Sequence, residues 1–217
     1  GIRRFTFQDY WGFLNPVSND CHDMILVVDK YAKELTNART FATVEIVGNP
    51  KYDHYRDLDP VALRARFWEK YNLNKKNAII GFVGQPLNQF KGYANTFKKC
   101  SEIVSEMGTN VRCFYRPHPK EDANTQHQIM RFFERSGCKV TLHDCDSPIE
   151  ELFAGTDLLV TFFSTAGYDA QMLNAFSDIA LASTLYLKTD DSINDFHKNQ
   201  NTMNEIPYSM PPFSLTV

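Results

Sequence analysis

From residue 78 onward, short runs of apolar residues alternate with stretches in which apolar residues recur every three or four positions. The short runs are typical of buried β-strands, and the three-to-four spacing is typical of helices with one buried face. The clearest helix has Tyr93, Phe97, Cys100, Val104 and Met107 on one face. The predicted strands are 78–83, 111–115, 139–142, 157–163 and one within 179–187.

The helices predicted between these strands begin and end at recognisable signals. Gly108 and Gly137 are natural helix stops, because glycine readily adopts the left-handed conformation that follows a last turn. Ser147, Pro148 and Glu150 form a capping-box pattern with Ser147 as the N-cap. Ser164-Thr165-Ala166-Gly167 opens a further helix after the longest apolar strand.

Strands and helices alternating at this spacing predict an α/β fold, with a Rossmann-like parallel sheet, right-handed crossovers and helices on both faces. The start of the chain has a similar pattern but fewer strands, at 24–28 and 43–47, with Asp29 capping a short helix between them. We predict that residues 1–47 are the remnant of an N-terminal α/β domain, that 48–77 are a linker and a helix, and that 78–217 form the Rossmann-like domain. The chain is therefore expected to be a fragment that lacks most of its N-terminal domain.

Composition and charge narrow the functional classes. The 217 residues are 43% hydrophobic and 23% charged, which is ordinary for a globular protein. A formal net charge of −3 gives no electrostatic footprint for general nucleic-acid binding. No apolar run approaches the length of a transmembrane helix, the start lacks a secretory signal pattern, and the five cysteines form no C-x-x-C pair. We therefore expect reduced cysteines and a cytoplasmic location.

Polar turns follow three of the predicted strands. Gln85 follows the first, Arg116-Pro117-His118-Pro119 the second, and Ser164-Thr165-Ala166-Gly167 the long apolar one. In open parallel sheets, ligands bind beyond the carboxyl ends of the strands. The three turns are therefore predicted to meet at one ligand site.

The residue types in these turns suit a phosphate. The helix start at Ser164 offers free backbone N–H groups and hydroxyls, and Arg116 with Lys120 supplies positive charge. His118, held between two prolines, can donate to a phosphate oxygen, and Asp169 either contacts a ribose hydroxyl or is a solvated helix residue. Two plainer interpretations stay open: the R-P-H-P turn is only a rigid turn, and the S-T-A-G sequence is only an N-cap.

Other chemistries are disfavoured by the sequence. His143-Asp144-Cys145-Asp146 contains metal-ligand residue types, but they are consecutive and lack separated partners. The chain has no G-x-G-x-x-G fingerprint, no P-loop and no G-x-S-x-G elbow. We predict no metal and no resident cofactor.

With these residues in view, the chain resembles the GT-B glycosyltransferase superfamily, in its bacterial cell-surface polysaccharide branch of sialyltransferase-like, capsule-transferase-like and CDP-glycerol-transferase-like proteins. The resemblance covers roughly residues 44–187 and rests on 80–85, 115–119 and 147–170. In those families a His-Pro motif and a Ser-Ser/Thr motif hold the nucleotide and phosphates of an activated donor. The resemblance implies that His118 and Pro119 match the first motif and that Ser164 and Thr165 match the second. Val47-Gly48-Asn49-Pro50 resembles the segment that joins the two domains.

The resemblance implies that residues 78–217 bind a CMP-, CDP- or UDP-linked sugar and that the complete enzyme transfers it to a glycan acceptor in surface-polysaccharide synthesis. Gln85, Arg116, Ala166, Gly167 and Asp169 would complete the binding site, whereas no catalytic residue is identified. Two alternatives stay open: an enzyme resembling UDP-N-acetylglucosamine 2-epimerase, and a non-catalytic ligand-binding domain. We also expect a peripheral position at the inner membrane, and self-association through surface exposed by the missing domain.

Overall fold

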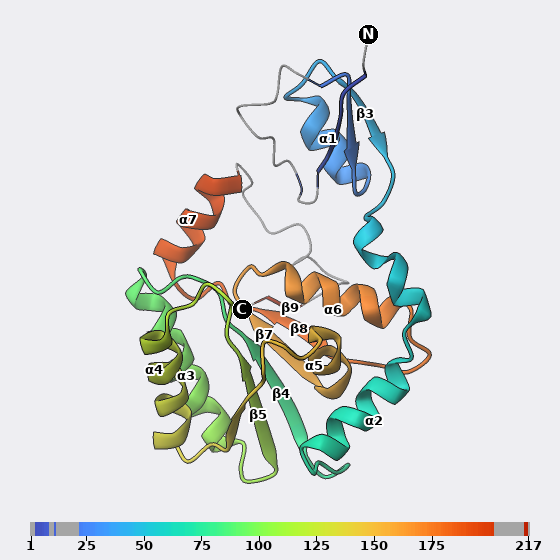
Figure 1. The fold of residues 1–217 in the computed structure, drawn as a ribbon. Helices are drawn as coiled ribbons and strands as arrows, with labels where there is room; N and C mark the ends of the chain where they lie inside the picture. The colour runs from blue at the N-terminus through green and yellow to red at the C-terminus, as the bar shows by residue number, and fades with distance from the viewer. Residues whose placement is uncertain (1–2, 9–10, 12–21, 202–214, 217) are drawn as a thin grey trace. The chain divides into compact units, whose positions relative to one another are not determined.

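The computed structural model describes residues 3–8, 11, 22–201 and 215–216 (Figure 1). The chain divides into two compact units. The first comprises Gly1–His54 with Phe196–Pro207, and the second comprises Tyr55–Asp195 with Tyr208–Val217. Each unit is described by itself.

The first unit contains a three-stranded parallel sheet in the order β1-β2-β3. Its strands are β1 (Phe5–Phe7), β2 (Met24–Val27) and β3 (Thr43–Ile46). Helix α1 (Lys30–Asn37) begins at Asp29, whose carboxylate accepts a 2.7 Å hydrogen bond from the backbone N–H of Ala32. The two strands and the capped helix predicted here are confirmed.

The second unit is built on a six-stranded parallel sheet in the order β6-β5-β4-β7-β8-β9. The chain leaves β4 toward one edge through β5 and β6, then returns beside β4 with β7 and continues toward the other edge. This arrangement is a doubly wound sheet whose order reverses between β4 and β7. The strands are β4 (Ala78–Val83), β5 (Val111–Arg116), β6 (Val140–Leu142), β7 (Leu158–Thr161), β8 (Ser183–Tyr186) and β9 (Leu215–Thr216).

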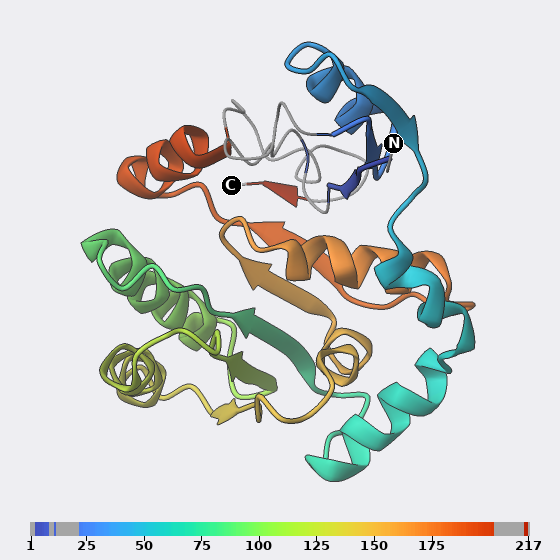
Figure 2. The same ribbon diagram turned by 45° about the horizontal axis from the view of Figure 1, so that its top comes forward.

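Helices cover both faces of this sheet, as predicted. Helices α3 and α4 lie together on one face, and α2, α5 and α6 lie on the other (Figures 1 and 2). The helices within this unit are α2 (Pro60–Lys70), α3 (Lys91–Glu106), α4 (Ala123–Arg135), α5 (Ile149–Gly155) and α6 (Thr165–Ala175). The 3₁₀ helix η1 (Pro50–Asp57) and helix α7 (Asp191–Asn201) each contain a boundary between the two units.

Aromatic side chains fill the space between the sheet and the helices. On the α3 side, Phe97 lies within 6.0 Å of Phe82 and Phe162, measured between ring centroids. On the α2 side, the ring of Phe67 lies 4.8 Å from that of Phe114. All five of these rings are fully buried. Large buried rings contribute strongly to packing, so they fix the strands whose ends carry the predicted site.

Three details differ from the sequence-based expectations. The predicted N-cap Ser147 is wrong: α5 begins after Pro148 and has no side-chain cap, and the hydroxyl oxygen of Ser147 accepts a 3.2 Å hydrogen bond from Lys70 instead. Met107 was expected on the buried face of α3 but is 57% exposed, because α3 ends at Glu106. Helix α7 and strand β9 were not predicted. The stops at Gly108 and Gly137 are confirmed by their positive φ angles of 93° and 79°.

Candidate functional site

The three predicted polar turns lie at the carboxyl ends of β4, β5 and β7. These are neighbouring strands, and β4 and β7 flank the point at which the strand order reverses. A crevice outside this point is the usual ligand site of doubly wound sheets. The topology therefore brings the three turns to one edge of the sheet, as the sequence suggested.

A continuous series of hydrogen bonds connects these turns. The side-chain carbonyl of Gln85 accepts from the backbone N–H of Phe163, at 2.9 Å, next to the S-T-A-G turn. The backbone N–H of Gln85 donates to the hydroxyl of Tyr93 at 2.7 Å, and that hydroxyl donates to Glu121 at 2.9 Å. Since Gln85 is only 6% exposed, its main observed contribution is to hold the turns in register. A direct contact of Gln85 with a ligand stays a prediction.

Glu121 is the centre of this network. Its carboxylate accepts hydrogen bonds from the hydroxyls of Tyr93 and Tyr115, at 2.9 and 2.6 Å, and from the backbone N–H of His118 at 3.2 Å. The residue is 5% exposed. Burial raises the pKa of the Glu121 carboxyl, while the hydrogen bonds from Tyr115, Tyr93 and His118 oppose the rise. Glu121 thereby fixes the backbone of the His-Pro turn through the N–H of His118.

His118 is half-buried and is oriented by its own turn. Its Nδ1 accepts a 3.0 Å hydrogen bond from the backbone N–H of Lys120. In the neutral ring, the proton then lies on Nε2. Burial and the nearby charge of Lys120 lower the pKa of His118 below its usual 6.5. The imidazole is therefore a neutral donor at pH 7, with Nε2–H as the group that can meet a phosphate oxygen.

Ser164 is the N-cap of α6. Its hydroxyl oxygen accepts a hydrogen bond from the backbone N–H of Ala166 at 3.2 Å, which leaves the hydroxyl hydrogen able to donate. Thr165, the first helical residue, has an exposed side chain. The N-terminus of a helix carries partial positive charge, so a phosphate is stabilised there. The expected N-cap chemistry is confirmed, and phosphate binding stays a prediction.

Gly167 has a packing role that the sequence did not reveal. A Cβ atom at this position would overlap the hydroxyl of Tyr186 and the methyl group of Thr184 on β8. Thr184 also donates a 3.1 Å hydrogen bond to the carbonyl of Gly167. Glycine here lets the start of α6 approach the sheet closely, so Gly167 positions the N-terminus of α6.

Gly167→Ala is therefore expected to destabilise the protein by about 1–3 kcal/mol through overpacking against β8. Chemical denaturation monitored by circular dichroism measures this difference. Thr165→Ala, at an exposed position in the same helical turn, is the control and should change stability by less than about 0.5 kcal/mol. Equal stability of the Gly167 variant and wild type would contradict this packing role.

Arg116 makes contacts that the sequence did not anticipate. One terminal nitrogen of its guanidinium lies 2.8 Å from Nδ1 of His143 and donates to the carbonyls of Asp144 and Ser147, at 2.9 and 2.8 Å. The other donates to the carbonyl of Cys145 at 3.0 Å. Arg116 thus organises the turn between β6 and α5. Its predicted contact with phosphate stays a prediction, and both terminal nitrogens of the guanidinium already have partners.

Asp169 lies on α6 and is 5% exposed, so the interpretation as a solvated helix residue is wrong. Burial of Tyr55 raises the pKa of its hydroxyl, and the charges of Asp169 and Glu150 raise it further. The predicted contact with a ribose hydroxyl stays a prediction. Pro119, in contrast, is exposed at the outside of the His-Pro turn.

Sequence reasoning missed Glu121 and the two tyrosines that hold it. In sequence, Glu121 is one charged residue in Lys120-Glu121-Asp122, which resembles a solvated turn. The sequence does contain one indication of its role: Glu121 lies three residues after His118. At this spacing a side-chain carboxylate can accept a hydrogen bond from the backbone N–H of His118. The prediction that Tyr93 lies on a buried helix face is confirmed, but the sequence indicates no partner for its hydroxyl.

No group of three or more His, Cys, Asp or Glu side chains in the described part of the chain is arranged to hold a metal ion. Within the same residues, no helix is long and apolar enough to cross a membrane.

Comparison with solved structures identifies the fold. A variant of the wall teichoic acid polymerase TagF matches 86% of this chain with a TM-score of 0.55 and 15% identity. HepE from Anabaena, solved in complex with UDP and glucose, matches 82% with a TM-score of 0.51 and 12% identity. A glycosyltransferase from Rickettsia africae matches 85% with a TM-score of 0.51 and 15% identity. The chain therefore has the GT-B fold.

The family follows from a separate sequence comparison. Residues 17–175 match the model of the CDP-glycerol:poly(glycerophosphate) glycerophosphotransferase family. Because the match covers more than half of the chain, the protein belongs to this family, and the resemblance noted from its motifs is confirmed. No curated protein sequence matches the chain.

The chain spans about half the length of the solved structures that it matches: 44% of TagF, 47% of HepE and 51% of the Rickettsia africae protein. The activity of a complete enzyme is for that reason treated as a proposal.

Proposed function

We propose that this chain is the donor-binding half of a glycerophosphotransferase and that its donor is CDP-glycerol. The family description motivates the choice of donor. The observation that carries the proposal is the network through Glu121 and Gln85, which joins the His-Pro turn to the start of α6 at the switch point of the sheet. The network thereby connects the two turns whose groups are proposed to bind phosphate.

In the proposed complex, two protein groups contact the diphosphate. His118 donates from Nε2, and the hydroxyl of Ser164 donates together with the backbone at the start of α6. Thr165 and Lys120 are exposed at the same edge and can add a hydroxyl and a positive charge. Neutral histidine suits this role, because it donates a hydrogen bond without requiring that a proton be taken up first.

The reaction of such an enzyme is a phosphoryl-group transfer. A hydroxyl oxygen of the acceptor forms a new bond to the β-phosphorus of CDP-glycerol, and the bridging P–O bond breaks. CMP leaves with the bridging oxygen, and the hydroxyl proton passes to a base. Negative charge develops on the leaving phosphate, where preorganised donors are most effective. His118 and the α6 terminus are proposed to stabilise that charge, and no base is assigned.

The test is a titration of the full chain with CDP-glycerol, in which isothermal titration calorimetry measures the affinity. We expect His118→Ala combined with Ser164→Ala to weaken binding by at least about 30-fold, because two hydrogen bonds to a charged phosphate are lost. His127→Ala, at an exposed position on α4, is the control for a general loss of imidazole. Equal affinity of the double variant and wild type would overturn the proposal.

The choice of nucleotide is tested in the same titrations. CDP-glycerol is expected to bind more tightly than UDP-N-acetylglucosamine. A preference for the uridine compound, with interconversion of its two hexosamine epimers, would favour the epimerase alternative instead. Binding of a glycan without affinity for any nucleotide would favour a non-catalytic domain.

A further inference from the structure

The segments that precede the three strands of the first unit are hydrogen-bonded to one another. The carbonyl of Arg4 accepts from the backbone N–H groups of Asp23 and Met24, at 3.0 and 3.3 Å. The carbonyl of Asp23 in turn accepts from the backbone N–H of Thr43 at 3.2 Å. Phe5, Met24 and Thr43 are also paired in register across β1, β2 and β3. These segments therefore form one edge of the sheet, here called the amino edge: residues 3–5, 22–23 and 39–43.

Two phenylalanines are exposed at the amino edge. Phe41, in the loop from α1 to β3, is fully exposed, with a relative accessibility of 110%. Phe5, the first residue of β1, is 55% exposed. Strands β1 and β3 lie on either side of β2, so their first residues are separated by two strand spacings, about 10 Å. Because large apolar side chains grouped in this way favour burial against a partner, the amino edge is a candidate interaction surface.

Arginines surround these aromatic side chains. Arg3 and Arg4 precede β1, and Arg39 lies in the loop from α1 to β3; all three are exposed. Asp23 is the one acidic residue of the amino edge, and its carboxylate accepts from the backbone N–H of Arg4 at 2.8 Å. Three arginines against one aspartate give the edge a positive charge, although the whole chain has a formal net charge of −3. The surface therefore attracts an anionic partner.

A cavity of about 400 Å³ lies at the same edge. Arg39, Thr40 and Thr43 line it, and a guanidinium and two hydroxyls can each donate a hydrogen bond to a phosphate oxygen. The hydroxyl oxygen of Thr40 accepts from the backbone N–H of Ala42 at 3.1 Å, which leaves the hydroxyl hydrogen able to donate. Phe41 lines the same cavity, so donors and aromatic ring lie together. The other lining residues are His22, Asp23 and Ala42.

The shape and chemistry of the amino edge suit an anionic bilayer better than a macromolecule with a fixed surface. A protein or a nucleic acid would need a pocket that matches the protruding ring of Phe41. The interface between lipid headgroups and acyl chains accepts aromatic side chains without such a pocket, and its phosphates attract arginines. Apolar insertion combined with charge attraction is the usual basis of reversible binding to a membrane surface.

We propose that the amino edge of the first unit docks on the surface of an anionic lipid bilayer. The two phenylalanines enter the interface, and the three arginines contact lipid phosphates. The sequence predicts a peripheral position at a membrane but indicates no surface for it. This inference does not rest on the proposed donor, so its test succeeds or fails independently of the titrations with CDP-glycerol.

The test measures binding of the full chain to sucrose-loaded vesicles by sedimentation. Vesicles made from a two-to-one mixture of phosphatidylcholine and phosphatidylglycerol are compared with vesicles of phosphatidylcholine alone. We expect binding to the anionic vesicles to be at least about tenfold tighter and to weaken as the salt concentration is raised. Phe41→Ala, and Arg3→Gln combined with Arg4→Gln, are each expected to weaken it about tenfold or more. The contact of Arg4 with Asp23 uses the backbone N–H, so the double variant keeps it.

Fluorescence quenching measures insertion of the aromatic ring directly. Phe41→Trp is expected to be quenched by anionic vesicles whose lipids carry bromine on their acyl chains. Phe176→Trp, at an exposed position after α6, is the control and should not be quenched. The chain's own two tryptophans give the background, which is measured in wild type.

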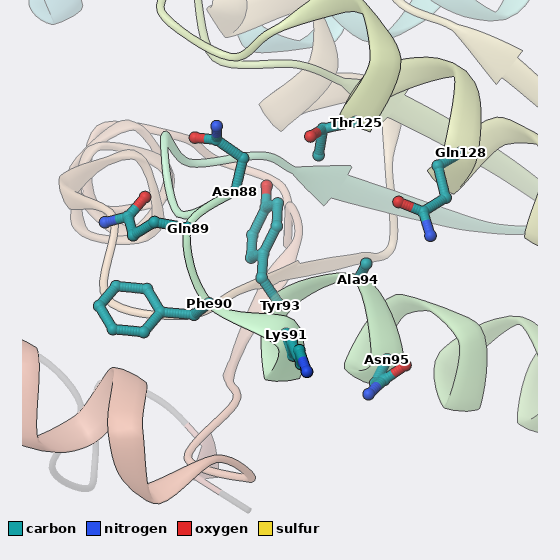
Figure 3. Close-up of a pocket in the computed structure, with 9 residues that line it drawn as sticks. All are labelled: Asn88, Gln89, Phe90, Lys91, Tyr93, Ala94, Asn95, Thr125 and Gln128. Atoms are coloured by element: carbon teal, nitrogen blue, oxygen red, sulfur yellow. The ribbon is translucent and has the colours of Figure 1, made fainter.

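Lys91→Gln with Lys99→Gln is the matched charge control and should bind anionic vesicles within about twofold of wild type. Both lysines are exposed on α3 of the second unit, and Lys91 itself lines a cavity of about 300 Å³ (Figure 3). This control shows whether any pair of cations near a cavity has the same effect.

The inference would be overturned by an absence of vesicle binding in wild type, or by equal binding to the two kinds of vesicle. An equal loss in the lysine control, or no quenching of Phe41→Trp, would overturn it as well. So would tighter binding of a single-stranded oligonucleotide than of anionic vesicles, because the arginines would then serve a nucleic acid.

Discussion

Glu121→Ala is expected to lower the free energy of unfolding by about 3–5 kcal/mol and to abolish detectable binding of CDP-glycerol. The substitution leaves the hydroxyls of Tyr93 and Tyr115 and the backbone N–H of His118 without their buried acceptor. It also removes the contact that fixes the His-Pro turn. Denaturant titration measures the first effect, and calorimetric titration of the folded variant measures the second.

Glu121→Gln separates charge from shape in this site. The amide keeps the volume and one acceptor oxygen, but its nitrogen must donate where the carboxylate accepted. We expect a smaller loss of stability, about 1–2 kcal/mol, with measurable but weakened binding. Glu106→Ala, at the exposed end of α3, is the control for losing a carboxylate and should change neither quantity. Wild-type affinity in the folded Glu121→Ala variant would show that this residue does not position the donor site.

The groups of the proposed donor site are fixed by buried hydrogen bonds, with Glu121 at their centre. A site that must stabilise charge in a transition state benefits from donors that are held rigidly in this way.

The sequence predicted the sheet well because its signals are local. The runs 78–83 and 111–115 are strongly apolar, and the resulting strands β4 and β5 match them within one residue. The turns at Gln85, His118 and Ser164 could also be found, since each follows such a run. Their convergence required only the strand order of a doubly wound sheet.

What could not be predicted depends on contacts between distant residues. Arg116 looked available for phosphate, yet its guanidinium meets the carbonyls of residues 28 to 31 positions away. Nothing near Arg116 in sequence indicates those partners. Ser147 shows the same effect, because its hydroxyl, expected to cap α5, accepts instead from Lys70, 77 positions away. Spacing identifies elements, but it does not identify the partner of a long side chain.

The contact between Arg116 and His143 leads to the second large effect, which is a dependence of stability on pH. His143 is fully buried, with its ring stacked 6.0 Å from that of Phe67. Burial, reinforced by the charges of Arg116 and Lys70, lowers the pKa of His143 to about 4, although Asp144 opposes the shift. Only the neutral ring can accept from Arg116 at Nδ1.

The sign follows from proton binding in the two states. Between pH 4 and 6.5 the unfolded chain holds a proton at this position and the folded chain does not. The stability contributed by neutral His143 is therefore complete above pH 6.5 and is lost as the pH falls toward 4. The shift corresponds to roughly 3 kcal/mol over that interval.

His143→Asn tests this dependence directly, because the asparagine oxygen can accept from Arg116 but does not titrate. The free energy of unfolding of wild type minus that of the variant should decrease by roughly 3 kcal/mol from pH 7 to pH 4. Any cost of the smaller side chain is independent of pH and cancels in this comparison. Leu142→Ala, at the neighbouring exposed position, is the non-titrating control, and its difference from wild type should stay constant. A constant difference for His143→Asn as well would mean that the turn held by Arg116 does not depend on a neutral imidazole.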